Sequence, residues 1–238
     1  IDTQFLPSAA LDVVERAEAA TGKKVELAVV LHANPDKFNG TATLQAHGVR
    51  VVTSKQVSDL LPAVHKKRVG WFGQRYAPDY PLAQAQPEVF GDATTTLSAG
   101  GVEITVHVLG AGCSAAHTAV LFDGHLFVGD LVANGNHAWM ELGLLDEWQA
   151  TLDALIALQP RFVHPGRGPS GGPELLTEQK AYLADVKARV LAKNPQGEPD
   201  AKVLEALKEE IVAAHPTYGY PYFVELGLPA VWRGLATK

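Results

Sequence analysis

Hydrophobic and polar positions in the first half of the chain predict strands and helices in turn. Residues 25–31 form a nearly continuous apolar run, which is typical of a buried parallel strand. Residues 49–52 predict a second strand, and residues 55–66 predict a helix. Another helix is predicted from an N-cap at Ser8 to a stop at Gly22. This succession of elements indicates an α/β layered fold.

The middle of the chain predicts antiparallel strands. Residues 102–108 alternate between apolar and polar side chains, the period-two pattern of a half-buried strand. Residues 118–122 and 125–128 predict two further strands that pair across a tight turn at Asp123-Gly124. We therefore expect the strands of this region to form their own antiparallel arrangement.

The last third of the chain is mainly helical in its pattern. Residues 146–158 predict an amphipathic helix that leads into a short strand at 161–163. The aperiodic segment 71–90 predicts a surface excursion that could cover a site. There is no internal repeat and no low-complexity tract, so we expect a single domain over residues 1–238.

Composition narrows the class of protein. Hydrophobic residues make up 47% and charged residues 19% of the chain, which is typical of a globular protein. The formal net charge of −6 argues against a nucleic-acid partner. No apolar run approaches the roughly 20 residues that cross a membrane, and the one cysteine, Cys113, excludes an internal disulfide. We expect a small-molecule partner, with no nucleic acid and no membrane, and the sequence leaves the oligomeric state open.

Polar side chains gather directly after predicted strands. One cluster spans residues 32–37, a second spans 110–114 with Asp130 after the next hairpin strand, and a third spans 164–166. Imidazole, carboxylate and thiolate groups are the ligand types that hold zinc or iron. Because strand ends are rigid supports, the order of these clusters indicates a metal or catalytic site.

The order of the clusters resembles the metallo-β-lactamase superfamily. That family has a His-x-His-x-Asp-His loop after a strand, then Gly-x-Gly-His, then Gly-Asp after a hairpin strand, and a final His before Gly. This chain has, in the same order, His32-x-Asn34-x-Asp36-Lys37, Gly110-x-Gly112-Cys113, Gly129-Asp130 and His164-Pro165-Gly166. The resemblance covers essentially the whole chain and implies a four-layer αββα sandwich. Ile1-Asp2-Thr3 is similar to a strand end inside that fold, so we expect the first strands upstream of Ile1 or missing.

Position by position, the resemblance implies a reduced metal site. Asn34, Lys37 and Cys113 replace three of the five usual histidine ligands. Asparagine is a poor ligand and lysine binds only when deprotonated, whereas a cysteine thiolate is a competent ligand. The resemblance then implies one divalent metal, zinc before iron or manganese, held by His32, Asp36, Cys113, Asp130 and His164.

Three interpretations of this site stay open. In the first, one metal is bound and the chain is a metal-dependent hydrolase. It would act on a small ester, lactone, lactam or related substrate through a metal-bound hydroxide, with Asp36 or Asp130 as the catalytic carboxylate that orients the water. In the second, the Lys37 ammonium replaces the charge of the metal, and the chain is a metal-free, non-catalytic member that binds a small ligand. A third hypothesis is nucleophilic chemistry by Cys113 with His117 or His164 as base.

Other polar residues near these clusters are predicted to contact substrate or to support the ligands: Asn34, Lys37, His117, His137 and Trp139. The segment 134–140 is similar to one branch of the superfamily whose members often carry export signals. The resemblance therefore favours an exported or periplasmic protein over a cytoplasmic one.

Overall fold

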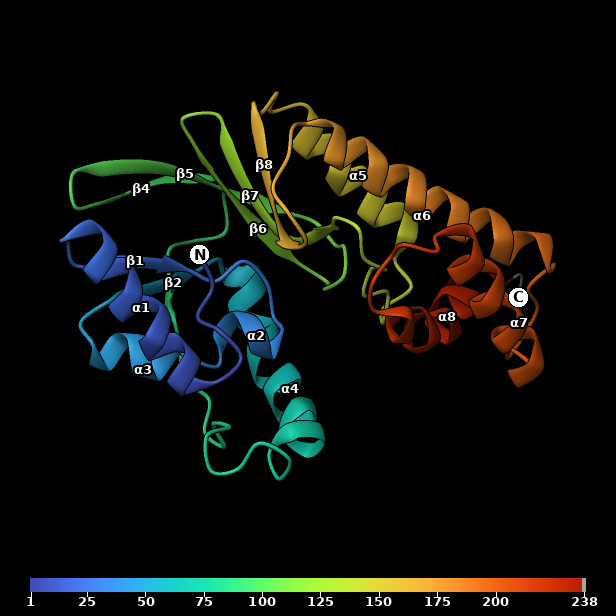
Figure 1. Ribbon diagram of the computed structural model, residues 1–238, viewed down its shortest axis with the longest axis horizontal. Coiled ribbons are helices and arrows are strands. Elements are labelled where there is room, and N and C mark those ends of the chain that lie inside the picture. Colours follow the sequence, from blue (N-terminus) through green and yellow to red (C-terminus); the bar gives the residue numbers. More distant parts are fainter. Residues whose placement is uncertain (237–238) are drawn as a thin grey trace. The chain divides into compact units, whose positions relative to one another are not determined.

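The computed structural model describes residues 1–236 as a mixture of helices and strands (Figure 1), which confirms the predicted α/β class. The chain divides into two compact units. The first contains Ile1–Val108 and Ala116–Phe122, and the second contains Leu109–Ala115 and the chain from Asp123 onward. A single domain over the whole chain stays a prediction.

The first unit is built around a parallel sheet of order β1-β2-β3. An antiparallel pair, β4 and β5, follows it and confirms the strand predicted over 102–108. Helix α1 packs against α3, and α4 contacts β6. The elements of this part of the chain are α1 (Pro7–Thr21), β1 (Leu27–Val29), α2 (Pro35–Phe38), α3 (Thr41–Ala46), β2 (Arg50–Thr53), α4 (Lys55–Phe72), β3 (Glu88–Val89), β4 (Thr95–Ala99), β5 (Val102–Leu109) and β6 (His117–Phe122).

Helix α1 begins one residue before its predicted cap. Its first residue is Pro7, whose ring fixes φ near the helical value, so that Leu6 takes the N-cap position. The Ser8 hydroxyl donates instead to the carboxylate of Asp79. The helix ends as predicted at Gly22, which has a left-handed φ of 66°.

Helix α4 is longer than the predicted segment 55–66. Its N-cap is Ser54, whose hydroxyl accepts the Val57 N–H at 3.2 Å. The helix continues to Phe72 because this ring packs edge-on against Phe5, with 5.3 Å between ring centroids. The irregular excursion that follows therefore starts later than the sequence predicts.

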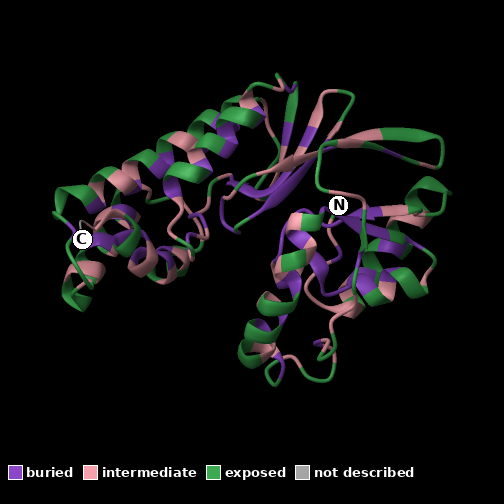
Figure 2. Cartoon of the chain, turned by 180° about the vertical axis from the view of Figure 1, so that it is seen from behind, coloured by how far each residue is buried: buried purple, intermediate pink, exposed green. Residues whose placement is uncertain are grey.

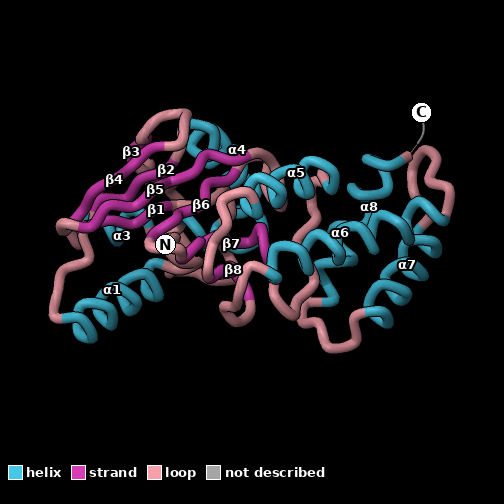
Figure 3. The backbone as a smooth tube through the Cα atoms, turned by 90° about the horizontal axis from the view of Figure 1, so that it is seen from above, coloured by secondary structure: helices cyan, strands magenta, loops and turns pink. Residues whose placement is uncertain are grey.

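The second unit contains a parallel strand pair and a group of helices. Strands β7 and β8 pair in register at Phe127 and His164. Helices α6, α7 and α8 contact one another and gather toward the C-terminal end (Figure 3). The inward faces of these helices carry the buried residues (Figure 2). The elements are β7 (His125–Ala133), α5 (Leu145–Ile156), β8 (Phe162–Arg167), α6 (Glu174–Ala192), α7 (Ala201–Ala214) and α8 (Pro221–Leu235).

Both strands of this pair run further than predicted. The predicted strand 125–128 continues to Ala133 because it pairs with β8 as far as Ala133 and Arg167, which places Asp130 inside β7 rather than after it. Strand β8 continues through His164 to Arg167, so His164 also lies inside a strand. The tight turn before β7 has positive φ at both Asp123 (43°) and Gly124 (77°), as predicted.

Within residues 1–236, none of the helices combines the length and the apolar character needed to span a bilayer.

Candidate functional site

Two buried imidazoles lie side by side in the first unit. His32 follows β1 and His117 begins β6; both are fully buried, and their ring centroids are 4.9 Å apart. The two residues form an isolated antiparallel bridge. Beside it, the Thr118 N–H donates to the Leu31 carbonyl at 2.7 Å, and the Thr118 hydroxyl is 3.3 Å from the same oxygen. The backbone therefore fixes the two rings next to each other.

Cys113 completes a group of three possible metal ligands. One ligand atom from each of His32, Cys113 and His117 lies within 4.8 Å of the other two, and all three residues are buried. A tight turn, in which the Gly112 N–H donates to the Ser114 carbonyl at 2.8 Å, holds the cysteine. Two imidazoles and one thiolate are a donor set that zinc accepts, and three protein ligands leave a fourth position open. These residues therefore fit one divalent metal.

His117 has a different place from the one that its sequence suggested. The sequence suggested that His117 contacts substrate, supports the ligands or acts as a base for Cys113, whereas the structure puts this imidazole among the possible ligands. The backbone bridge between His32 and His117 reveals this possible role, and it joins residues that are far apart in the chain. No local pattern shows such a pairing.

Lys37 is buried among carboxylates in the same unit. Its ammonium lies 2.9 Å from the Asp36 carboxylate and 3.9 Å from that of Asp2. The Leu31 N–H donates to Asp2 at 2.9 Å. Burial raises the pKa of the Asp2 carboxyl, and the neighbouring Lys37 ammonium and His32 ring oppose this rise. A lysine cation therefore already compensates the Asp36 charge, and Asp2 is a further partner that the sequence did not indicate.

Asn34 supports this loop through its backbone. It is the N-cap of α2 in an extended conformation, and its side chain makes no capping hydrogen bond. Its carbonyl accepts the Lys37 N–H at 2.9 Å, and its N–H donates to the His32 carbonyl at 3.1 Å. The short helix thus carries Asp36 and Lys37 on a rigid turn.

Asp130 is neutralised by an arginine in the second unit. Its side chain is 4% exposed, and Arg167 Nη2 lies 3.5 Å from Oδ2. The guanidinium also lies over the rings of Tyr220 and Phe223, with 5.4 and 5.3 Å between Cζ and the centroids. Strand β8 approaches Asp130 closely because residue 166 is glycine. A Cβ at this position would overlap Asp130 Oδ1. Arg167 directly follows the segment 164–166 but was not among the predicted site residues.

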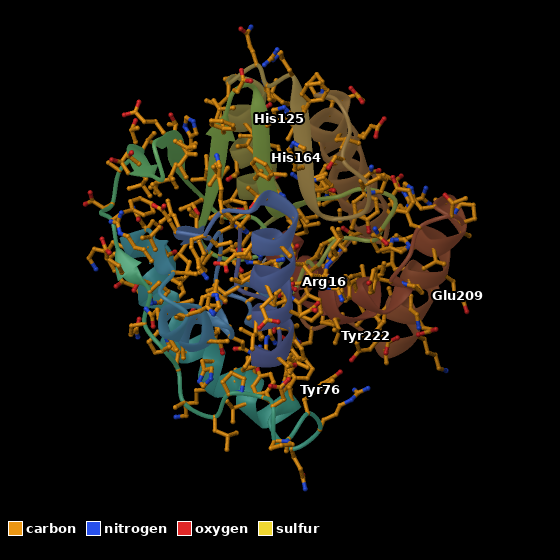
Figure 4. The ribbon with its side chains drawn as sticks, turned by 60° about the vertical axis from the view of Figure 1, so that its left-hand side comes forward. Arg16, Tyr76, His125, His164, Glu209 and Tyr222 are labelled. Atoms are coloured by element: carbon orange, nitrogen blue, oxygen red, sulfur yellow. The ribbon has the colours of Figure 1, made fainter. Side chains whose placement is uncertain are left out.

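His164 lies beside another histidine of the second unit. Its Nε2 is 2.9 Å from His125 Nδ1, and its Nδ1 is 2.8 Å from Ser170 Oγ. Figure 4 shows the two histidines together at one end of the strands. Burial, and secondarily the neighbouring His125, lowers the pKa of His164. Both ring nitrogens of His164 therefore have neighbours within this unit.

His137 and Trp139 lie in the loop after β7. His137 is fully buried, and its Nδ1 is 3.0 Å from the Tyr182 hydroxyl. Burial lowers the pKa of His137 to about 4, so its ring is neutral at pH 7. The Trp139 N–H donates to Glu141 at 3.1 Å, and its ring packs edge-on against Phe223. Both side chains are thus anchored within the second unit.

Among known proteins, solved structures are similar to this chain. No protein-family model matches the chain, and no curated protein matches it. Solved structures do match. A metallo-beta-lactamase from Pontibacter korlensis is 24% identical, with a TM-score of 0.61 over 78% of this chain and 81% of that chain. The metallo-beta-lactamase FIM-1 from Pseudomonas aeruginosa, in its mono-zinc form, is 19% identical, with a TM-score of 0.59 over 77% of each chain.

A further solved structure, the DIM-1 metallo-beta-lactamase, is 17% identical, with a TM-score of 0.60 over 77% of this chain and 80% of that chain. Together these likenesses show that the chain has the metallo-β-lactamase fold. The resemblance in the order of its motifs is therefore confirmed for the fold. The convergence of Asp36, Asp130 and His164 on one metal stays a prediction.

Proposed function

We propose that this chain is a single-metal hydrolase that acts on a small ester, lactone, lactam or related substrate. The observation that carries the proposal is the buried group of His32, Cys113 and His117, whose ligand atoms lie within 4.8 Å of one another. Imidazole with thiolate favours zinc over the harder divalent ions. The solved mono-zinc form of FIM-1, which shares the fold, supports a one-metal centre.

The residues of the chain have separate roles in this proposal. His32 and His117 would hold the metal as neutral imidazoles, and Cys113 would hold it as a thiolate. A bound divalent metal lowers the pKa of water and polarises a carbonyl oxygen. Asp36, whose negative charge Lys37 stabilises at 2.9 Å, would orient the attacking water. The burial of the three ligands excludes bulk water from the group.

The ion pairs of two carboxylates support a second possible function. Lys37 pairs with Asp36, and Arg167 pairs with Asp130, so cations already compensate two of the predicted ligand carboxylates. Buried carboxylates need such compensation, and a metal is one of several ways to supply it. This favours a metal-free protein that binds a small ligand without hydrolysing it.

Metal content and hydrolysis measured together separate the two functions. The full chain is purified with zinc supplied, and its metal is quantified by mass spectrometry. We expect about one equivalent in the parent and in His47→Ala, a matched histidine control outside the group. Cys113→Ala and His117→Ala should lose most of it.

A panel of aryl esters, lactones and a chromogenic lactam then tests the reaction. Hydrolysis that needs the metal and falls in Cys113→Ala supports the hydrolase. A parent that binds no metal overturns the proposal and favours the ligand-binding alternative. A parent that binds metal but hydrolyses no member of the panel keeps the metal site and overturns the hydrolase.

A further inference from the structure

The end of helix α4 carries cations and exposed apolar side chains together. Residues 60–78 contain four lysine or arginine residues and no aspartate or glutamate, although the whole chain has a net charge of −6. The acidic residues that flank this range are already engaged, because Asp59 pairs with Lys55 at 2.7 Å and Asp79 accepts the Ser8 hydroxyl. The segment is therefore a local basic region in an acidic protein.

Trp71 contacts two cations of this region and still reaches solvent. It lies one helical turn after Lys67, whose Nζ is 5.1 Å from the centroid of the indole ring. Arg68 Cζ is 4.2 Å from the same centroid. The tryptophan is nevertheless 44% exposed. An exposed indole beside cations is typical of surfaces that contact the layer of lipid headgroups.

Leu82 adds a second apolar side chain at the same end of the helix. It is 71% exposed, more than any other large hydrophobic residue among residues 1–236. A Cβ added to Gly73, the C-cap of α4, would lie 3.3 Å from Leu82 Cδ2, so the leucine lies beside the last turn. Figure 2 shows mostly exposed residues at this end of α4 and in the chain after it. Neighbouring exposed apolar side chains of this size commonly mark a contact surface.

The acidic remainder of the chain does not cancel the charge of this surface. At physiological ionic strength, charges in water are screened over about 8 Å. Lys66, Lys67 and Arg75 are exposed, so an anionic surface that touches the end of α4 meets these cations. A lipid bilayer offers both anionic headgroups and an apolar layer beneath them, which suits Trp71 and Leu82. An acidic peptide offers the charge without that layer.

We propose that the end of α4 binds the surface of an anionic lipid membrane. The cations contact the headgroups, and the two apolar side chains enter the interface. The contact is peripheral and reversible, because it lacks the long apolar segment that makes insertion permanent. The expectation of no membrane partner rested on the lack of such a segment, and this contact does not need one. The membrane-binding surface lies in the first unit and consists of Lys66, Lys67, Trp71, Arg75 and Leu82.

Co-sedimentation of the full chain with vesicles tests this surface. Vesicles of phosphatidylcholine are compared with vesicles in which part of it is replaced by phosphatidylserine. We expect binding to the anionic vesicles, which weakens as salt is added. Each cation near an anionic membrane contributes about fivefold to binding, so Lys66→Gln combined with Lys67→Gln should bind about 25-fold more weakly. The matched control, Lys23→Gln combined with Lys202→Gln, removes two exposed lysines elsewhere and should bind like the parent.

The fluorescence of Trp71 reports whether the end of α4 enters the lipid layer. Anionic vesicles with brominated acyl chains quench a tryptophan that comes close to these chains. We expect quenching in the parent and its loss in Trp71→Phe, which keeps the other three tryptophans of the chain. Quenching that persists unchanged in Trp71→Phe would contradict the proposed orientation of this surface and overturn the proposal.

Two further results would overturn the proposal. The first is equal binding of the parent to neutral and anionic vesicles, or equal binding of the double variant and its control to anionic vesicles. The second is binding to polyglutamate without binding to vesicles, which would indicate an acidic protein partner instead. If the double variant unfolds more easily than the parent, Arg75→Gln provides another test, with an expected loss of about fivefold. None of these measurements uses a metal or a hydrolysed substrate, so failure here differs from failure of the proposed hydrolase.

Discussion

The Lys37 ammonium lies 2.9 Å from the Asp36 carboxylate, and the lysine side chain is only 6% exposed. Asp2 lies 3.9 Å from the same ammonium and accepts the Leu31 N–H. Buried charges of this kind are costly to separate, because the partner left behind has no solvent to compensate it. The loop after β1 is therefore stabilised by this buried ion pair as well as by the backbone bridge between His32 and His117.

Removal of the Lys37 charge should destabilise the chain. We expect Lys37→Met to lower the free energy of unfolding by about 3 kcal/mol, because Asp36 and Asp2 lose their shared cation. Urea unfolding measures the change. Lys24→Met, which removes an exposed lysine paired with Glu18, should cost no more than about 0.5 kcal/mol. Equal effects of the two substitutions would contradict this account of the loop.

Arg167 should have a similar role for Asp130. Arg167→Ala removes the cation 3.5 Å from a carboxylate that is 4% exposed, and it also removes the packing on Tyr220 and Phe223. We expect a loss of about 2–4 kcal/mol in chemical unfolding. The control is Arg161→Ala, whose pair with Asp123 is exposed and should contribute at most about 1 kcal/mol. A loss at Arg167 no larger than at Arg161 would show that Asp130 needs no cation.

His137 should make stability depend on pH. Its pKa is lowered to about 4 by burial, whereas an unfolded histidine titrates near 6.5. Between these values the unfolded chain binds the extra proton, so stability is present above about pH 6.5 and is lost as the pH falls toward 4. This group contributes at most about 3 kcal/mol to the change.

Urea unfolding at several pH values in parent and His137→Gln measures this contribution. The variant should lose less stability between pH 7 and pH 4 than the parent. Other histidines and carboxylates titrate in both proteins, so the difference between the two curves isolates His137. Parallel curves would show that the fold does not lower the pKa of His137.

Local pattern was enough to predict several elements of the fold and part of the site. The alternation over residues 102–108 correctly predicted β5. The Asp123-Gly124 pair correctly predicted the tight turn before β7. Polar residues after strands pointed to His32 and Cys113, which the structure brings within reach of one metal. These features depend on side chains close together in the sequence, which is why periodicity shows them.

The remaining features depend on pairing between distant segments. His117 is a possible ligand because its backbone bridges His32. Strand β8 passes through Pro165 and Gly166, which locally indicate a loop, because it pairs with β7 through a register shift at Gly129. The sequence therefore predicted that His164 lies in a loop after a strand, whereas the structure places it within β8 beside His125.

Gly166 gives the sharpest test of the close packing around Asp130. A Cβ at this position would overlap Asp130 Oδ1 and would lie too near the Gly129–Asp130 backbone of β7. Because β7 and β8 are paired strands, neither backbone can move away without loss of pairing. We expect Gly166→Ala to destabilise the chain by about 2–4 kcal/mol, the range of severe packing changes. The matched control is Gly70→Ala in α4, where no atom lies within 4 Å of the added carbon and alanine should stabilise the helix by up to about 1 kcal/mol. Thermal and urea unfolding of both variants measure the difference, and a neutral Gly166→Ala would mean that Asp130 is not held against β8 in the folded protein.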